Sequence, residues 1–147
     1  MSFKENFIRD TSAFGGLPIY FTIAFIALVL QKLSLFWQIA AGFIICYAVT
    51  TPIRAIYFKA RPDKEKYTNW LTRLDASSFP SLHSMRVAVL AVVLANFFNS
   101  ILITLAFAIA AIGAAIARVL MKKHYWSDII AGAAIGIIIG FIMINIL

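Results

Sequence analysis

Charge is scarce in this sequence, and most of it has one sign. Only 13% of the 147 residues are charged, and Lys and Arg outnumber Asp and Glu by 13 to 6. Hydrophobic residues make up 63% of the chain, and the mean hydropathy is +0.92. This composition excludes a soluble domain with a polar surface, so we predict a multi-pass integral protein of the cell membrane.

Cysteine is almost absent as well. The single Cys46 lies in an apolar run, which excludes an intrachain disulfide and predicts a small buried side chain. The first ten residues include four charged ones, so no cleavable secretory signal is expected there. The expected partner is the lipid bilayer rather than a nucleic acid.

Long uncharged runs predict the membrane spans, because a hydrocarbon core of roughly 30 Å requires about 20 helical residues. The polar break Asn96–Ser100 divides an uncharged run of 31 residues, Val87–Ala117, into two spans. The predicted fold is an all-α polytopic membrane helix bundle, forming a single transmembrane domain over residues 1–147. Its five transmembrane helices are expected at about 12–31, 34–54, 81–98, 101–121 and 128–147.

Two further patterns concern how these spans are connected and packed. Between the second and third spans, Trp70, Leu71 and Leu74 recur at helical spacing among charged residues, which predicts a short interfacial helix. In the last span, glycines recur every fourth residue, at 132, 136 and 140. Such a face lets another helix approach closely, and packing within the chain is favoured over dimerisation.

Five spans place twelve of the thirteen Lys and Arg residues on one side of the membrane, with Lys32 alone on the other. This side holds the amino terminus and the connections 54–80 and 118–128. By the positive-inside rule it is predicted to be cytoplasmic.

Several charged residues on that side lie at span ends, where charge is costly and commonly functional. Arg54 and Arg61 are seven residues apart, so both project from one helical face. Arg118 ends the fourth span. Arg86, one turn beyond His83, is expected either to extend to the interface or to contact substrate.

The chain has only two histidines, His83 and His124, and both are at span ends on this side. Asp128 follows His124 by four residues, a spacing at which a helix brings carboxylate and imidazole together. A metal site built from these three residues is one hypothesis. Three nearby guanidinium groups argue against it, because they repel a divalent cation and suit phosphate oxygens.

The residues around Pro80 strengthen the case for an anion. Proline suits the first turn of a helix, and the free backbone N–H groups beyond it can bind an anion. The Ser81 hydroxyl adds a further donor.

Three blocks together resemble a known family: Arg54-x6-Arg61-Pro62, Pro80-Ser81-Leu82-His83 and Arg118-x5-His124-x3-Asp128. They are similar to the signature of the type 2 phosphatidic acid phosphatase superfamily, whose members include integral membrane lipid phosphatases. Its usual form is Lys-x6-Arg-Pro, Pro-Ser-Gly-His and Ser-Arg-x5-His-x3-Asp. This chain departs from it with Arg54 for lysine, Leu82 for glycine and Ala117 for serine.

The resemblance implies a role for each matching residue. His124 would attack phosphorus and form a phosphohistidine, with Asp128 orienting it. His83 would protonate the leaving oxygen and then activate water. The phosphate-binding set would be Arg54, Arg61, Ser81, Arg118 and the backbone N–H groups near Leu82 and His83. No metal or other cofactor is expected.

The predicted function is a metal-independent lipid phosphatase, acting on a lipid phosphate or a polyprenyl or other lipid pyrophosphate. An alternative is a phosphotransferase, in which an alcohol rather than water captures the phosphohistidine. A second alternative is a non-catalytic anion-binding protein or channel. The complete set of His83, His124 and Asp128 disfavours it, because permeation needs no nucleophile.

Overall fold

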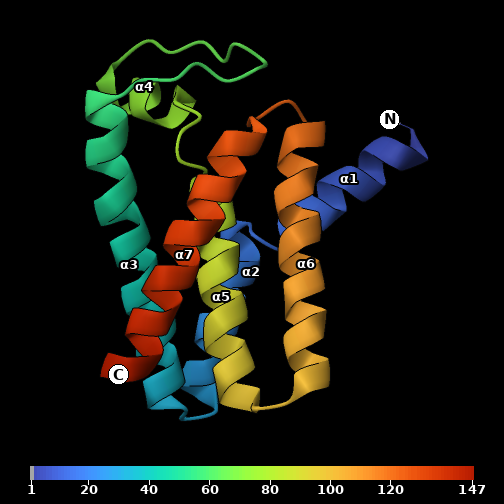
Figure 1. The fold of residues 1–147 in the computed structure, drawn as a ribbon, viewed down its shortest axis with the longest axis vertical. Helices are drawn as coiled ribbons and strands as arrows, with labels where there is room; N and C mark the ends of the chain where they lie inside the picture. Colours follow the sequence, from blue (N-terminus) through green and yellow to red (C-terminus); the bar gives the residue numbers. More distant parts are fainter. Residues whose placement is uncertain (1) are drawn as a thin grey trace.

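The computed structural model describes residues 2–147, and over this range the fold is all-helical, as predicted. An isolated antiparallel bridge between Ala60 and Ser77 is the only β-type pairing in that part of the chain. The helices in chain order are α1 Phe3–Ala13, α2 Leu17–Val29, α3 Leu33–Ile56, α4 Trp70–Ala76, α5 Leu82–Phe98, α6 Ile101–Leu120 and α7 Trp126–Ile146 (Figure 1).

Four predicted spans agree with helices α3, α5, α6 and α7 to within two residues at each end. The first predicted span, 12–31, does not form one helix. It is divided between α1 and α2, which meet at a bend of 40°. Gly16 caps α2, and Pro18 follows in its first turn. Proline lacks an N–H and clashes with the preceding turn, so a single helix cannot continue through this point.

Helix length and composition give three membrane-spanning candidates, α3, α6 and α7, or four if the bent α1–α2 pair is one span. The sequence predicts five. The remaining predicted span corresponds to α5, which has 17 residues and is largely buried among its neighbours α3, α6 and α7. A helix enclosed by protein need not match the hydrocarbon thickness by itself.

Helix α5 forms the centre of the bundle, and the glycine face of α7 packs on it. A Cβ at Gly132 would collide with the Ser81 carbonyl, and one at Gly136 with the Met85 carbonyl. A Cβ at Gly140 would lie 2.7 Å from Val92 Cβ. The predicted close approach is therefore confirmed as packing within the chain.

The polar connections gather at one end of the bundle. Figure 1 places the α3–α4–α5 connection and the α6–α7 loop there, with the α2–α3 and α5–α6 turns at the opposite end. The expected short helix is present as α4, capped by Asn69, whose side chain accepts from the Thr72 N–H. Most outward-facing side chains of the spans are apolar, Ile109 and Ile130 among them, as expected for a surface in contact with lipid.

Candidate active site

The first two sequence blocks are joined by a short extended pairing. Ala60 bridges Ser77, and the Ser78 N–H donates to the Lys59 carbonyl at 2.7 Å. The Lys59 N–H donates to Ser77 Oγ at 3.3 Å. This pairing fixes Arg61, which follows Ala60, beside the segment that leads into Pro80.

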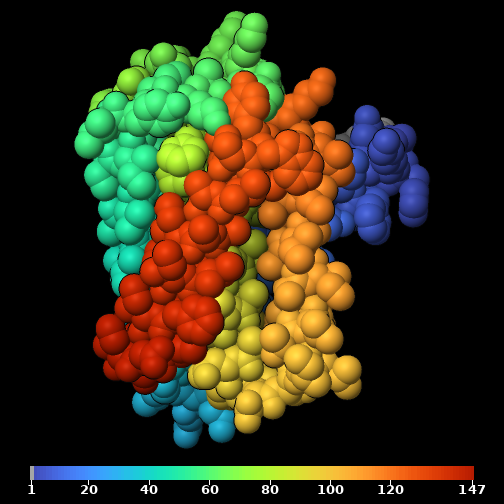
Figure 2. Space-filling view, viewed as in Figure 1, coloured from blue at the N-terminus to red at the C-terminus, as the bar shows by residue number. Residues whose placement is uncertain are grey.

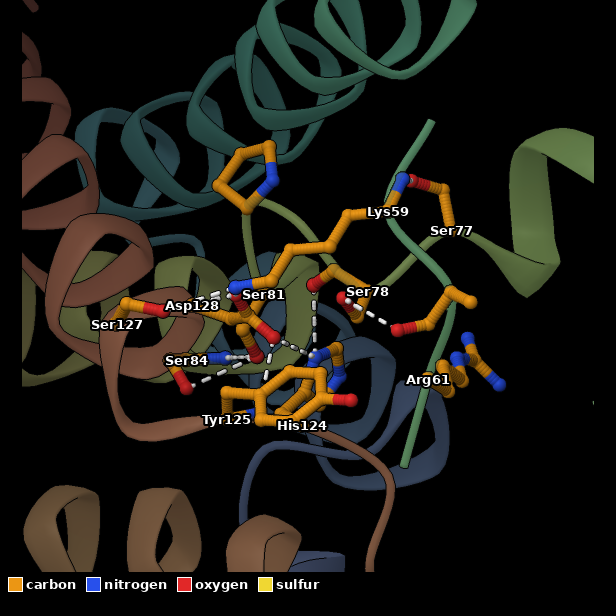
Figure 3. Close-up of polar contacts among 12 residues, drawn as sticks. Lys59, Arg61, Ser77, Ser78, Ser81, Ser84, His124, Tyr125, Ser127 and Asp128 are labelled. Atoms are coloured by element: carbon orange, nitrogen blue, oxygen red, sulfur yellow. Dashed lines mark hydrogen bonds and ion pairs between the residues drawn. The ribbon is translucent and has the colours of Figure 1, made fainter. Parts of the chain in front are cut away.

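The third block is attached to the second by two contacts, which Figure 3 shows in part. The Ser81 N–H donates to the Asp128 carbonyl at 3.0 Å. His124 Nδ1 lies 2.8 Å from the Ser78 carbonyl oxygen, and His124 is only 3% exposed. Residues separated by more than forty positions thus form one buried polar cluster at the end of the bundle.

The bond to Ser78 sets the tautomer of His124. A carbonyl oxygen can only accept, so Nδ1 carries the proton and Nε2 presents its lone pair. Burial, followed by the positive charges of Arg118 and Arg61, lowers the pKa of His124 to about 3. The ring is therefore neutral at physiological pH, which is the state a nucleophile needs.

Asp128 lies close to His124 but does not bond to it. Its Oδ2 is 3.9 Å from His124 Nδ1, beyond hydrogen-bond distance. The same oxygen accepts from the Tyr125 N–H at 2.9 Å, and Oδ1 accepts from Lys59 Nζ at 2.6 Å. In this structure the Ser78 carbonyl orients the imidazole, and the carboxylate anchors the start of α7.

Lys59 is a site residue that the sequence did not identify. Its ammonium contacts Asp128 and Ser127 Oγ and lies 4.6 Å from the centre of the Tyr125 ring. It stands two residues before Arg61, outside every matching motif position. Its only signal in the sequence is a positive charge at a variable position of the first motif.

Two of the three predicted phosphate-binding arginines already bond to protein. Arg54 donates to the carbonyls of Leu74 at 3.1 Å and Pro80 at 3.0 Å, which holds the α4–α5 connection against α3. Arg61 pairs with Glu65 and donates to the Asp75 carbonyl. Arg118 and both of these arginines act electrostatically on His124, so the three positive charges converge on one ring.

Unsatisfied polar atoms mark the same region. Within residues 2–147, the buried side-chain polar atoms that lack a partner are Nε of Arg54, Arg61, Arg86 and Arg118 and Nε2 of His83. Guanidinium groups are donors only, and buried donors are costly when left unpaired. A set of this kind is complementary to an anion with several oxygens.

Ser81 and Leu82 begin α5. Ser81 is the N-cap, and its Oγ accepts from the Ser84 N–H at 3.3 Å and from Ser84 Oγ at 3.0 Å. The N–H groups of Leu82 and His83 are then the remaining donors of the first turn. Leu82 has ordinary helical geometry, so this position does not require the glycine of the usual motif.

The bend between α1 and α2 lies against His83. A Cβ on Gly15 would be 2.5 Å from His83 Nε2, and the Gly15 carbonyl accepts from Arg86 at 3.1 Å. Arg86 also donates to the Tyr47 hydroxyl at 3.2 Å. Arg86 is therefore buried in the bundle and does not extend to the interface.

Ion pairs fasten the loop that contains Arg61 to the loop that contains His124. Lys123 Nζ lies 2.6 Å from Asp63 and 3.3 Å from Glu65. The hydrogen bond that Lys123 donates to the Asp63 carboxylate raises the pKa of Lys123. The Asp63 N–H also donates to the Lys122 carbonyl at 3.1 Å.

As for metals, residues 2–147 contain no cluster of three or more His, Cys, Asp or Glu side chains able to hold an ion.

Comparison with known proteins agrees with the three motifs. The family model described as the PAP2 superfamily matches residues 33–147, which is most of the chain. The chain belongs to the PAP2 superfamily. The resemblance to type 2 phosphatidic acid phosphatases is thereby confirmed, and the PAP2 match includes every predicted site residue.

One solved structure has a similar fold over nearly the whole chain. The crystal structure of Aquifex aeolicus LpxE superimposes with a TM-score of 0.81, covering 99% of this chain and 87% of that one. The sequences are 19% identical, so this similarity concerns the fold. No curated protein sequence matches the chain.

Proposed function

We propose that this PAP2 protein is a membrane lipid phosphatase that works through a phosphohistidine on His124. The observation that carries the proposal is the state of this ring. It is neutral, buried and bonded through Nδ1, so Nε2 is left with its lone pair beside three arginines. Residues 1–147 act as one phosphatase domain.

The reaction has two steps. His124 Nε2 attacks phosphorus, the bond from phosphorus to the leaving oxygen breaks, and His83 supplies a proton to that oxygen. Water then attacks phosphorus of the phosphohistidine, the bond from phosphorus to His124 Nε2 breaks, His83 takes the proton from the water, and inorganic phosphate leaves. The arginines and the first-turn N–H groups of α5 stabilise the charge on the phosphoryl oxygens.

The position of the site favours a lipid substrate. The site lies where helices end at the polar end of the bundle, so a head group can enter while the tails remain among the spans. The substrate class is a lipid phosphate or a lipid or polyprenyl pyrophosphate. The reaction is independent of metal, because clustered guanidinium groups repel a divalent cation and themselves supply the charge that phosphoryl transfer requires.

Purified protein in detergent tests the proposal. Phosphate release from phosphatidic acid, phosphatidylglycerophosphate and polyprenyl pyrophosphate is measured in EDTA. His124→Ala is expected to lose at least about a thousandfold in kcat. Lys66→Ala, which removes an exposed positive charge at the same end, is the matched control and is expected to retain activity.

Two results would overturn this mechanism. One is phosphate release that persists in His124→Ala, and the other is release that stops in EDTA and returns with a divalent cation. Labelled phosphate trapped on wild-type protein under alkaline quench, and absent from His124→Ala, identifies the intermediate directly. Release of phosphate to water, with no transfer to added alcohols, distinguishes a phosphatase from a phosphotransferase.

A further inference from the structure

A groove of about 530 Å³ runs along the apolar part of the molecule between α5, α6 and α7. Figure 2 shows a furrow between α6 and α7, with α5 visible at its floor. Sixteen residues line the groove, and all but Ser84, Asn96 and Thr104 are apolar. Seven of the sixteen are alanines, and their small side chains leave the space unfilled.

One end of the groove reaches the active site. Ser84 lines the groove, and its Oγ donates to Oγ of Ser81, the N-cap residue of the candidate phosphate site. Ser84 also directly follows the proposed acid, His83. The groove and the anion-binding cluster are therefore neighbours that meet at Ser84.

The other end is marked by polar side chains. Asn96 near the end of α5 and Thr104 in the first turn of α6 line the groove there. From Ser84 to Asn96 a helix rises by about 18 Å, at roughly 1.5 Å per residue. This is slightly more than one leaflet of a hydrocarbon core about 30 Å thick.

We propose that this groove binds one hydrocarbon chain of the lipid whose phosphate occupies the active site. The inference rests on the proposed function and extends it to the tail of the substrate. The apolar lining excludes a polar ligand, and the length suits a chain that spans one leaflet. A substrate chain is favoured over those of bulk lipids because the bound phosphate holds it at high effective concentration beside the groove.

Two alanines on α6 provide a test by chain length. Ala115 lies toward the site end of α6, and Ala108 lies two turns, about 10 Å, further along the groove. Ala106, on the same helix, is exposed and does not line the groove. The matched variants are Ala115→Phe, Ala108→Phe and the control Ala106→Phe, assayed with dihexanoyl, didecanoyl and dipalmitoyl phosphatidate.

Ala108→Phe is expected to lower kcat/KM for the dipalmitoyl substrate at least about tenfold, and to leave the dihexanoyl substrate within about twofold. Ala115→Phe is expected to impair the didecanoyl substrate as well, and Ala106→Phe none of the three. Equal effects of Ala108→Phe and Ala106→Phe on the dipalmitoyl substrate would overturn the inference. So would equal losses in Ala108→Phe at every chain length.

A binding measurement separates this inference from the proposed function. In a background with the native tryptophans replaced by Phe, Ile112→Trp places a fluorophore at the open side of the groove, which Ile112 lines while 60% exposed. Ile109→Trp places one at an exposed position of α6 that does not line the groove. Phosphatidate with brominated chains is expected to quench Ile112→Trp more than brominated phosphatidylcholine does, with no such difference at Ile109→Trp. If wild-type protein releases no phosphate, the proposed function fails, and this quenching still decides the groove. Equal quenching by the two lipids would refute it.

Discussion

At the scale of single residues, the bond from His124 Nδ1 to the Ser78 carbonyl determines what this ring can do. It fixes the proton on Nδ1 and leaves Nε2 free, while burial and neighbouring arginines keep the ring neutral. A neutral imidazole in the correct tautomer requires no general base before it attacks phosphorus.

The state of His124 can be titrated by NMR in the free protein. Because its pKa is lowered from about 6.5 to about 3, the ring signals are expected to stay those of neutral imidazole as pH falls through 6 and 5. Arg118→Gln removes a positive charge and should move the titration upward. His83→Gln leaves a single histidine and so assigns the signal. A titration midpoint near 6.5 in wild type would contradict the buried, cationic environment.

Lys59 and Asp128 form an ion pair in which the carboxylate is fully buried and the ammonium is partly exposed. Removing the lysine leaves a buried charge without its partner. Lys59→Gln is therefore expected to lower the free energy of unfolding by about 1–3 kcal/mol, measured by unfolding in detergent micelles. Lys66→Gln, at an exposed position, should change it by less than about 0.5 kcal/mol.

A double-mutant cycle gives this pair a second readout. Adding Asp128→Asn to Lys59→Gln should recover part of the lost stability, because the uncompensated charge is then gone. If the two single losses simply add, the ion pair does not stabilise the fold.

At the scale of elements, contact between α5 and α7 positions both parts of the site. Gly136 faces the Met85 carbonyl so closely that an added methyl group must push the helices apart. Gly136→Ala is expected to destabilise the protein by about 1–3 kcal/mol through overpacking. It should also lower kcat, because the start of α5 and the start of α7 are displaced together.

Gly113 on α6 is the matched control. A methyl group there would lie 3.3 Å from Thr11 Cγ2, at the tip of a side chain that can move. Gly113→Ala also gains helix propensity, so its stability should be unchanged or increased. Similar melting temperatures for Gly136→Ala and Gly113→Ala would show that the close approach of α7 is unimportant.

The bend between α1 and α2 also positions a site residue, because it packs against His83. Gly15→Ala would press a methyl group against His83 Nε2 and shift the proposed acid. We expect kcat to fall about a hundredfold for alkyl phosphates, whose leaving oxygen needs a proton. p-Nitrophenyl phosphate has a leaving group that does not, so its hydrolysis should change little. Equal losses for both substrates would indicate general disruption rather than misplacement of an acid.

At the scale of the whole molecule, the distribution of charge predicts orientation in the membrane. The Lys and Arg residues concentrate at the end that holds the site, so we propose that this end is cytoplasmic. In a Cys46→Ser background, a cysteine at Lys66 should resist an impermeant thiol reagent in intact cells. One at the carboxyl terminus should react. The reverse pattern would place the site on the outer face.

Much of the helical architecture could be predicted from the sequence because a membrane permits few alternatives. Backbone groups in hydrocarbon must bond within a helix, so uncharged runs give the ends of α3, α5, α6 and α7 closely. The glycine spacing of α7 likewise predicted its close packing. The bend at Gly15 and Gly16 was missed, because hydropathy does not respond to a change of helix direction.

The candidate site could be predicted in its residues but only partly in its contacts. Motif spacing identified His83, His124, Asp128 and the arginines, because their types and positions along the chain are properties of the sequence. The oxygen that orients His124 belongs to Ser78, 46 residues earlier in the chain, and Ser78 is placed by its pairing with Lys59. A local sequence motif gives no information about a contact between residues so far apart in the chain.

The sequence by itself determined the membrane class, most helix boundaries and the family, since these depend on composition, hydrophobic run length and motif spacing. Only the tertiary structure decided that Asp128 pairs with Lys59, that the α1–α2 bend contacts His83 and that a groove extends from Ser84 between three helices. Each of these features is formed by residues that are far apart in the chain. Their positions follow from how the helices pack, which a linear pattern of residues does not encode.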